Sequence, residues 1–120
     1  MLKIYFLVLL INTFSISTVV NAGSSLKIID GDTIILNSEK IRFYGIDTPE
    51  IKQTCTNNNG QSYSCGVKAT LELKKIIGSR KVSCIKKTKD WYKRSISICY
   101  VDGKDINSLM VKKGWALAYR

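Results

Sequence analysis

The sequence predicts a mainly β domain with two helices, folded as a partly closed, five-stranded antiparallel barrel. Five short segments are rich in the β-branched and aromatic residues that favour strands, and amphipathic segments follow the third and the fifth of them. The chain has 120 residues, which leaves room for one domain, and its 45% hydrophobic content and single proline are those of a chain that folds. Because a barrel closes the edges of so small a sheet, this arrangement indicates a barrel of the OB type.

The first three expected strands are rich in Ile, Phe and Tyr, are separated by polar turns, and lie at residues 26–29, 33–36 and 40–46. The next segment, residues 51–63, contains Cys55, three consecutive asparagines and Gly60 and has no hydrophobic period. We therefore expect a long exposed loop there.

The first helix is expected at residues 67–77, where apolar positions recur at helical spacing among lysines and Gly78 follows as a stop. Two more strands are expected at residues 81–86 and 95–101, and the second alternates Ile and Tyr with Ser and Cys. A short helix should begin near Ile106 and end before Gly114.

The first 22 residues have the pattern of an export signal. Lys3 supplies a positive end, eight apolar residues follow at 4–11, and small residues at 20–22 offer a cleavage site. Polar residues break the apolar run well short of the roughly 20 residues that a membrane span needs, which favours cleavage over an uncleaved anchor. We expect residues 1–22 to be a signal peptide and residues 23–120 a mature domain that is secreted or periplasmic, without stable membrane association.

The charge and the absence of histidine narrow the chemistry. The chain has 19 Lys and Arg against 9 Asp and Glu, a formal charge of +10, and no His. This excludes Ser–His and Cys–His nucleophile pairs, His-ligated zinc and imidazole acid–base catalysis, which leaves carboxylates, Arg, Lys or a metal. The basic excess predicts attraction to polyanions without sequence preference.

The cysteines predict two disulfides. An even number of cysteines in a small exported domain is normally oxidised, and a zinc site is disfavoured because there is no Cys-x-x-Cys pair. The four residues are Cys55, Cys65, Cys84 and Cys99. From the residues alone, all three pairings stay open.

Two acidic clusters flank the second and third strands, at residues 30–33 and 47–50. Each alone fits a turn or a loop, but an antiparallel hairpin brings both to one rim and makes Asp32 and Asp47 neighbours. Two adjacent carboxylates require a cation or an arginine between them, and hard oxygen ligands suit calcium or magnesium, with Thr48 able to add a carbonyl. Arg42 and Asp47 are five residues apart, which puts them on opposite faces of an ideal strand, so a bend is expected, at Gly45.

Four segments in order resemble the staphylococcal nuclease (thermonuclease) family: Ile29-Asp30-Gly31-Asp32-Thr33, Arg42-Phe43-Tyr44-Gly45-Ile46-Asp47-Thr48-Pro49-Glu50, Asp90-Trp91-Tyr92-Lys93-Arg94, and Asn107 with Gly114-Trp115-Ala116. The resemblance covers about residues 26–119. The cysteines are similar to those of the exported bacterial branch, which implies the pairs Cys55 with Cys65 and Cys84 with Cys99.

The resemblance implies a calcium-dependent phosphodiesterase that acts on DNA and RNA. By that resemblance, Asp32 and Asp47 match the calcium carboxylates and Thr48 matches a carbonyl ligand. Glu50 matches the general base for the attacking water. Arg42 and Arg94 match the arginines that bind the phosphate, where in-line attack builds negative charge that guanidinium groups and a divalent cation stabilise.

Two aromatic residues, Tyr92 and Tyr119, are candidates for stacking on a base or for hydrogen bonding to a phosphate, which favours single-stranded or frayed substrate.

Two features depart from the family pattern. Lys93 stands where the family has glycine, so we expect a backbone conformation there that a side chain resists. Relatives continue beyond Arg120 into a further helix, so we expect a truncated chain that lacks the C-terminal helix and is only marginally stable.

We therefore expect an exported, monomeric, calcium-dependent nuclease with little sequence specificity. The main alternative is a non-catalytic OB-fold module that binds nucleic acid, or an inactive truncated nuclease. A disulfide-stapled cationic peptide that acts on anionic membranes is a third hypothesis, but it has no use for the two acidic clusters.

Overall fold

The computed structural model describes residues 15–17 and 24–119. Apart from residues 15–17, the expected signal peptide at residues 1–22 lies outside the described residues. No helix in the described part of the chain is long and apolar enough to cross a membrane.

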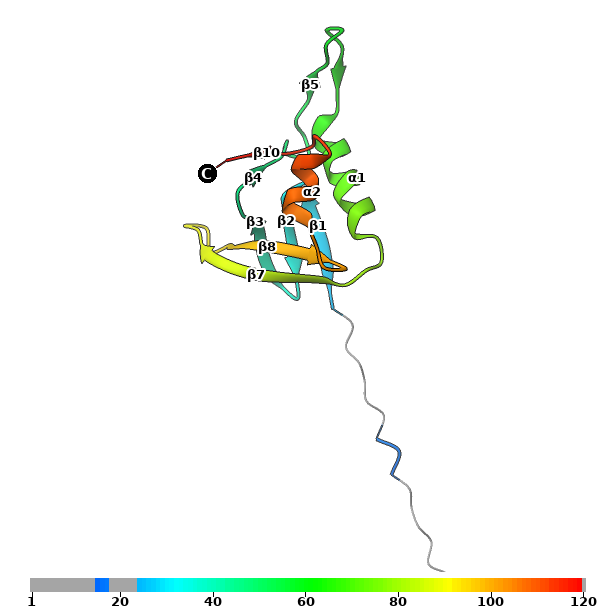
Figure 1. Cartoon of the computed structure of the whole chain (residues 1–120), viewed down its shortest axis with the longest axis vertical. Coiled ribbons are helices and arrows are strands. Elements are labelled where there is room, and N and C mark those ends of the chain that lie inside the picture. The colour runs from blue at the N-terminus through cyan, green and yellow to red at the C-terminus, as the bar shows by residue number, and fades with distance from the viewer. Residues whose placement is uncertain (1–14, 18–23, 120) are drawn as a thin grey trace, which may run out of the picture.

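A mixed sheet forms the body of the described domain (Figure 1). Its strand order is β1–β2–β3–β8–β7, and β9 pairs with β8. The strands are β1 (Leu26–Asp30), β2 (Thr33–Leu36), β3 (Glu39–Phe43), β7 (Val82–Lys89), β8 (Ser95–Val101) and β9 (Lys104–Asp105). The expected mainly β fold with two helices is confirmed.

One strand pairing differs from the antiparallel expectation. Strands β3 and β8 run parallel, with Arg42 in register with Ile96, whereas the other pairings of this sheet are antiparallel. Parallel neighbours need a long crossover, and the segment from β3 to β8 supplies one because it contains a helix and strand β7. The prediction of a purely antiparallel sheet is therefore wrong at this pairing.

The two helices cover the core of the sheet. Helix α1 (Cys65–Ile77) begins two residues before its expected start and ends at Gly78, whose φ of 57° is in the left-handed region. Helix α2 (Ile106–Lys112) is capped at its N-terminus by Asp105, whose carboxylate accepts a hydrogen bond from the Ser108 amide at 3.0 Å. The fully buried core side chains include Ile34, Phe43, Leu73, Ile106 and Met110.

The third expected strand is divided in two. Strand β3 ends at Phe43, and β4 (Ile46–Asp47) begins after a turn in which Gly45 has a φ of 75°. The bend expected at Gly45 is therefore present, and β4 pairs with β10 (Leu117–Ala118) rather than with the main sheet.

The loop expected at residues 51–63 is exposed except at the half-buried Cys55 and Tyr63. It also contains a small hairpin that was not expected, β5 (Cys55–Thr56) with β6 (Ser62–Tyr63). Strand β7 extends three residues beyond its expected end at residue 86. The disulfides are Cys55–Cys65 and Cys84–Cys99, as the family resemblance implied.

Candidate active site

The turn between β1 and β2 carries Asp32 into the protein. Asp32 is only 5% exposed, and its carboxylate accepts hydrogen bonds from the Thr33 hydroxyl at 2.9 Å and the Thr48 amide at 2.9 Å. Gly31 permits this close approach, because a Cβ at that position would lie 2.8 Å from Thr48 Oγ1. A turn alone gives no reason to bury a carboxylate, so the burial of Asp32 points to a site.

Arg42 joins the two acidic clusters. Its Nη1 lies 2.8 Å from Asp32 Oδ2 and donates to the Ile46 carbonyl at 2.9 Å, while its Nη2 lies 3.2 Å from Asp47 Oδ1. The Arg42 side chain is 15% exposed and those of Asp32 and Asp47 are 6% and 65% exposed. The two carboxylates thus share one rim with the arginine between them; we call Asp32, Arg42, Asp47 and Thr48 the acidic rim.

A buried asparagine from α2 fixes the bend that directs Asp47 to the acidic rim. Asn107 is 4% exposed, and its Nδ2 donates to the carbonyls of Tyr44 at 2.9 Å and Ser97 at 3.1 Å. Its Oδ1 accepts from the Cys99 amide at 3.2 Å. The sequence shows Asn107 only as part of a motif; the structure gives it a positioning role.

Glu50 lies on the exposed loop after β4. Its amide donates to Gln53 Oε1 at 3.3 Å, and its carbonyl accepts from the Gln53 amide at 2.8 Å. This loop also packs tightly on α1, because a Cβ at Gly66 would lie 1.6 Å from the Glu50 carbonyl oxygen. Sequence reasoning missed Gly66, although glycine in the first turn of a helix is an unfavourable residue that indicates a close contact.

A hollow of about 280 Å³ opens beside the acidic rim. It lies between the segment after β4, with Asp47, Thr48 and Pro49, and the segment that leads into β10, with Trp115. Strand β10 is in register with β4, and the Tyr119 amide donates to the Gly45 carbonyl at 2.9 Å. Tyr119, 52% exposed, thus pairs with Gly45, two residues before Asp47.

Asp30 adds a further carboxylate to this region, and sequence reasoning gave it no role. Burial raises the pKa of Asp30 to about 6, helped by the hydrogen bond and the negative charge of Asp32. Asp30 Oδ1 also accepts from the Asp32 amide at 3.1 Å. The turn therefore brings the carboxylates of Asp30 and Asp32 close together, and Arg42 pairs with that of Asp32.

The oxygen donors of the acidic rim fit a hard divalent cation. Asp32 and Asp47 would supply carboxylates and Thr48 would supply a backbone carbonyl. Calcium takes six to eight such oxygens, so further oxygen ligands would have to complete the shell. Thr48 Oγ1 is buried without a hydrogen-bond partner in the described structure. Within residues 15–17 and 24–119, no cluster of three or more His, Cys, Asp or Glu side chains could hold a metal. A cation here would therefore need the carbonyl as well as the two carboxylates.

The structure places Arg94 and Tyr92 on a separate element, the turn between β7 and β8. Asp90 Oδ1 accepts from the amides of Tyr92 at 3.0 Å and Arg94 at 2.9 Å, and Asp90 Oδ2 lies 2.6 Å from Arg94 Nε. The Arg94 guanidinium also lies over the Tyr92 ring, 5.5 Å from its centroid. Arg94 comes two residues before Ile96, the register partner of Arg42.

This turn shifts the pKa of Asp90 and holds Lys93 in an unusual backbone conformation. Burial acts to raise the pKa of Asp90, but the amide and guanidinium of Arg94 and the amide of Tyr92 outweigh it and hold that pKa below its ordinary value. Lys93 has a φ of 62°, so the unusual backbone conformation expected at this position is confirmed.

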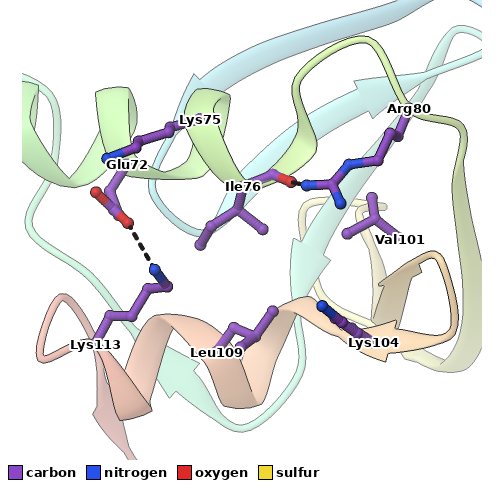
Figure 2. Close-up of a pocket in the computed structure, with 8 residues that line it drawn as sticks. All are labelled: Glu72, Lys75, Ile76, Arg80, Val101, Lys104, Leu109 and Lys113. Carbon is purple, nitrogen blue, oxygen red and sulfur yellow. Dashed lines mark hydrogen bonds and ion pairs between the residues drawn. The ribbon is translucent and has the colours of Figure 1, made fainter.

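A second hollow, of about 240 Å³, lies between α1 and α2 (Figure 2). Apolar side chains line part of it, and two of its four cations are engaged: Lys113 Nζ lies 3.4 Å from Glu72 Oε1, and Arg80 donates to the Ile76 carbonyl. Its lining contains none of the predicted site residues. We therefore take the acidic rim as the candidate active site.

The fold is that of a small basic domain of the OB-like class. Its acidic rim places carboxylate oxygens and an arginine together. The family model described as staphylococcal nuclease homologue matches residues 40–120. The chain belongs to this family, so the family resemblance of the sequence is confirmed.

Three relatives illustrate the similarity. The chain is 34% identical over 93 residues to the succinoglycan biosynthesis protein ExoI of Rhizobium meliloti, with 76% of this chain and 49% of the relative covered. It is 32% identical over 125 residues to an uncharacterized endonuclease of Haemophilus influenzae, with 94% and 65% covered. It is 35% identical over 97 residues to endonuclease YncB of Bacillus subtilis, with 75% and 44% covered. The chain thus spans about half the length of the curated relatives it matches.

Proposed function

We propose that this chain is a calcium-dependent nuclease that hydrolyses phosphodiester bonds of DNA and RNA with little sequence specificity. The observation that carries the proposal is the acidic rim, in which Arg42 contacts both Asp32 and Asp47. Relatives named endonucleases support the same activity.

Both arginines keep donors for a phosphate. A guanidinium has five N–H donors, and in the described structure Arg42 uses three, on the Ile46 carbonyl, Asp32 and Asp47. Arg94 uses its Nε on Asp90, which leaves its two Nη groups for the non-bridging oxygens. In this proposal the two arginines bind and orient the phosphate, Arg42 from β3 and Arg94 from the turn that leads into β8, the strand paired with β3.

Glu50 is proposed as the general base. Its carboxylate is on an exposed loop, which the contact with Gly66 and the Cys55–Cys65 disulfide attach to the start of α1. A carboxylate on such a loop can accept the proton of a water beside the phosphorus.

The proposed calcium ligands are Asp32, Asp47 and the Thr48 carbonyl. When bound, the cation would neutralise charge on the phosphate and favour its approach to a rim that already carries two carboxylates.

We further propose that residues 1–22 direct export and are cleaved, and that the mature monomer works in the periplasm or outside the cell. Two disulfides fit an oxidising compartment. Tyr119, which follows β10, and Tyr92, on the β7–β8 turn, are exposed, and we propose that they contact unpaired bases or phosphates of single-stranded or frayed substrate.

The test is cleavage of denatured DNA and of RNA by the oxidised protein, with calcium and then with excess chelator. The matched control is Glu50→Gln, which removes the base but keeps the shape of an exposed side chain. Cleavage that needs both calcium and Glu50 would support the proposal. A folded protein that binds DNA but cleaves nothing would instead favour the non-catalytic binding module.

A further inference from the structure

The tip of the β7–β8 hairpin presents an aromatic side chain that the fold does not use. Trp91 is 99% exposed and Tyr92 is 82% exposed, although a tryptophan normally buries a large apolar area. Figure 1 shows this tip at the free end of the hairpin, at one side of the sheet. Trp91 therefore contributes nothing to the core, and its surface is free for a ligand.

The conformation of the tip does not depend on Trp91. The Asp90 carboxylate binds the amides of Tyr92 and Arg94, and the Lys93 amide donates to the Asp90 carbonyl at 3.1 Å. These hydrogen bonds fix the backbone of the turn that carries Trp91, and none of them involves the indole.

The chain around Trp91 is strongly basic. Residues 86–94 contain five Lys or Arg and one Asp, and the side chains of β7 from residue 85 to 89 are exposed. The register of β7 and β8 shifts between Lys86 and Thr88, which marks a bulge at Lys87. Bulges redirect side chains and increase strand twist, and they are frequent next to active sites.

We propose that Trp91 is a stacking platform for an unpaired base of single-stranded nucleic acid, and that the lysines of β7 hold the adjoining phosphates. This inference rests on the proposed function and extends it to a substrate contact beyond the scissile phosphate. An exposed indole offers a face to any base, and lysines spaced along a strand follow a backbone without reading its sequence. Because stacking needs an unpaired base, Trp91 selects single strands over duplex.

A membrane surface is the other chemistry that a basic, tryptophan-bearing tip suggests. Insertion needs a contiguous apolar surface larger than two side chains, but the exposed pair Trp91 and Tyr92 is flanked by the charged residues Asp90 and Lys93. The position of Trp91 three residues before the proposed phosphate ligand Arg94 favours nucleic acid.

The experiment measures binding without turnover. The oxidised chain is titrated, in chelator, with a labelled single-stranded oligothymidine and with a duplex of equal length. We expect Trp91→Ala to weaken single-strand binding about tenfold and duplex binding much less, and Trp91→Phe to retain most of the affinity. Leu71→Ala, at a 56% exposed apolar residue on α1, is the matched control and should change neither.

Tryptophan fluorescence gives a second readout. The only other tryptophan is Trp115, so the difference between the parent and Trp91→Phe isolates the emission of Trp91. Stacking predicts quenching by the oligonucleotide in the parent that Trp91→Phe lacks. Unchanged affinity in Trp91→Ala, or a fluorescence response to anionic vesicles and none to the oligonucleotide, would overturn the inference. The nuclease proposal is tested separately, because quenching without cleavage supports the platform alone, and cleavage with no effect of Trp91→Ala supports the nuclease alone.

Discussion

The two proposed phosphate-binding arginines are held in opposite ways. Arg42 is fixed by two carboxylates from different elements, Asp32 in the turn between β1 and β2 and Asp47 in β4, and its side chain is only 15% exposed. Arg94 is fixed by its own turn, through Asp90 four residues earlier, and its side chain is 26% exposed. The acidic rim therefore depends on the fold, whereas the β7–β8 tip depends on local hydrogen bonds.

Arginine therefore has a different structural role in each region. Arg42 connects separate elements of the fold, whereas Arg94 is held within a single turn. Removing a charge from the acidic rim should damage both stability and activity, because buried partners are left behind. Removing a charge from the tip should damage binding and activity while the fold remains. Each of the following predictions tests that separation.

The largest effect is expected for Arg42→Ala. The substitution leaves the buried Asp32 carboxylate without its cation, so the free energy of unfolding should fall by roughly 3 kcal/mol and cleavage should be lost. Denaturant unfolding at neutral pH, followed by circular dichroism, measures the loss of stability.

Arg94→Ala is the matched comparison. It should abolish cleavage while costing only a fraction of the stability lost with Arg42→Ala, because Asp90 still accepts the backbone amides of the turn. Equal destabilisation by the two substitutions would show that the tip is as dependent on its arginine as the acidic rim is, and would remove the distinction.

Gly66→Ala should give the next largest effect. The added methyl group would collide with the Glu50 carbonyl, so we expect a loss of about 2 kcal/mol in stability and at least tenfold in cleavage as the loop moves. Oligonucleotide binding at the tip should be retained. Val67→Ala, at the next helical position and 42% exposed, is the control. Normal cleavage by a fully stable Gly66→Ala variant would separate the Glu50 loop from catalysis.

The sequence predicts those parts of the fold that short-range patterns determine. Strands β1, β2 and β8 and helix α1 follow from the hydrophobic period and the turn residues. The bend at Gly45 follows from the odd spacing of Arg42 and Asp47, because residues five apart lie on opposite faces of a straight strand. The strained backbone at Lys93 was likewise predictable, because a family pattern of glycine reports a backbone conformation.

Long-range contacts could not be predicted in this way. The parallel pairing of β3 with β8 depends on how the crossover packs, and the contact of Gly66 with Glu50 joins two segments that no local pattern relates. The bridging role of Asn107 is hidden for the same reason, since its partners Tyr44 and Ser97 come from two other elements. The engagement of Arg42 with both carboxylates was predicted only as one of two options, an arginine or a cation.

A smaller effect is expected at Lys93. A residue with a side chain pays roughly 1–2 kcal/mol to adopt the left-handed conformation of Lys93, and glycine does not. Glycine also raises the conformational entropy of the unfolded chain, which offsets part of this gain. Lys93→Gly should therefore stabilise the protein by about 0.5–1 kcal/mol. Lys93→Ala removes the same charge but keeps the strain, and it should not stabilise. If both variants stabilise equally, charge repulsion at the tip, and not the backbone, is the cause.

The smallest effect concerns single lysines. Lys89 on β7 is beside the tip, whereas Lys27 on β1 is exposed at the opposite edge of the sheet. If the tip contacts phosphates, Lys89→Ala should reduce the slope of log affinity for a single strand against log salt by about 0.7, and Lys27→Ala should leave it unchanged. Binding isotherms from 50 to about 200 mM salt resolve this difference. Equal slopes for the two variants would mean that the net positive charge attracts the strand as a diffuse field, without a defined path across the β7–β8 hairpin.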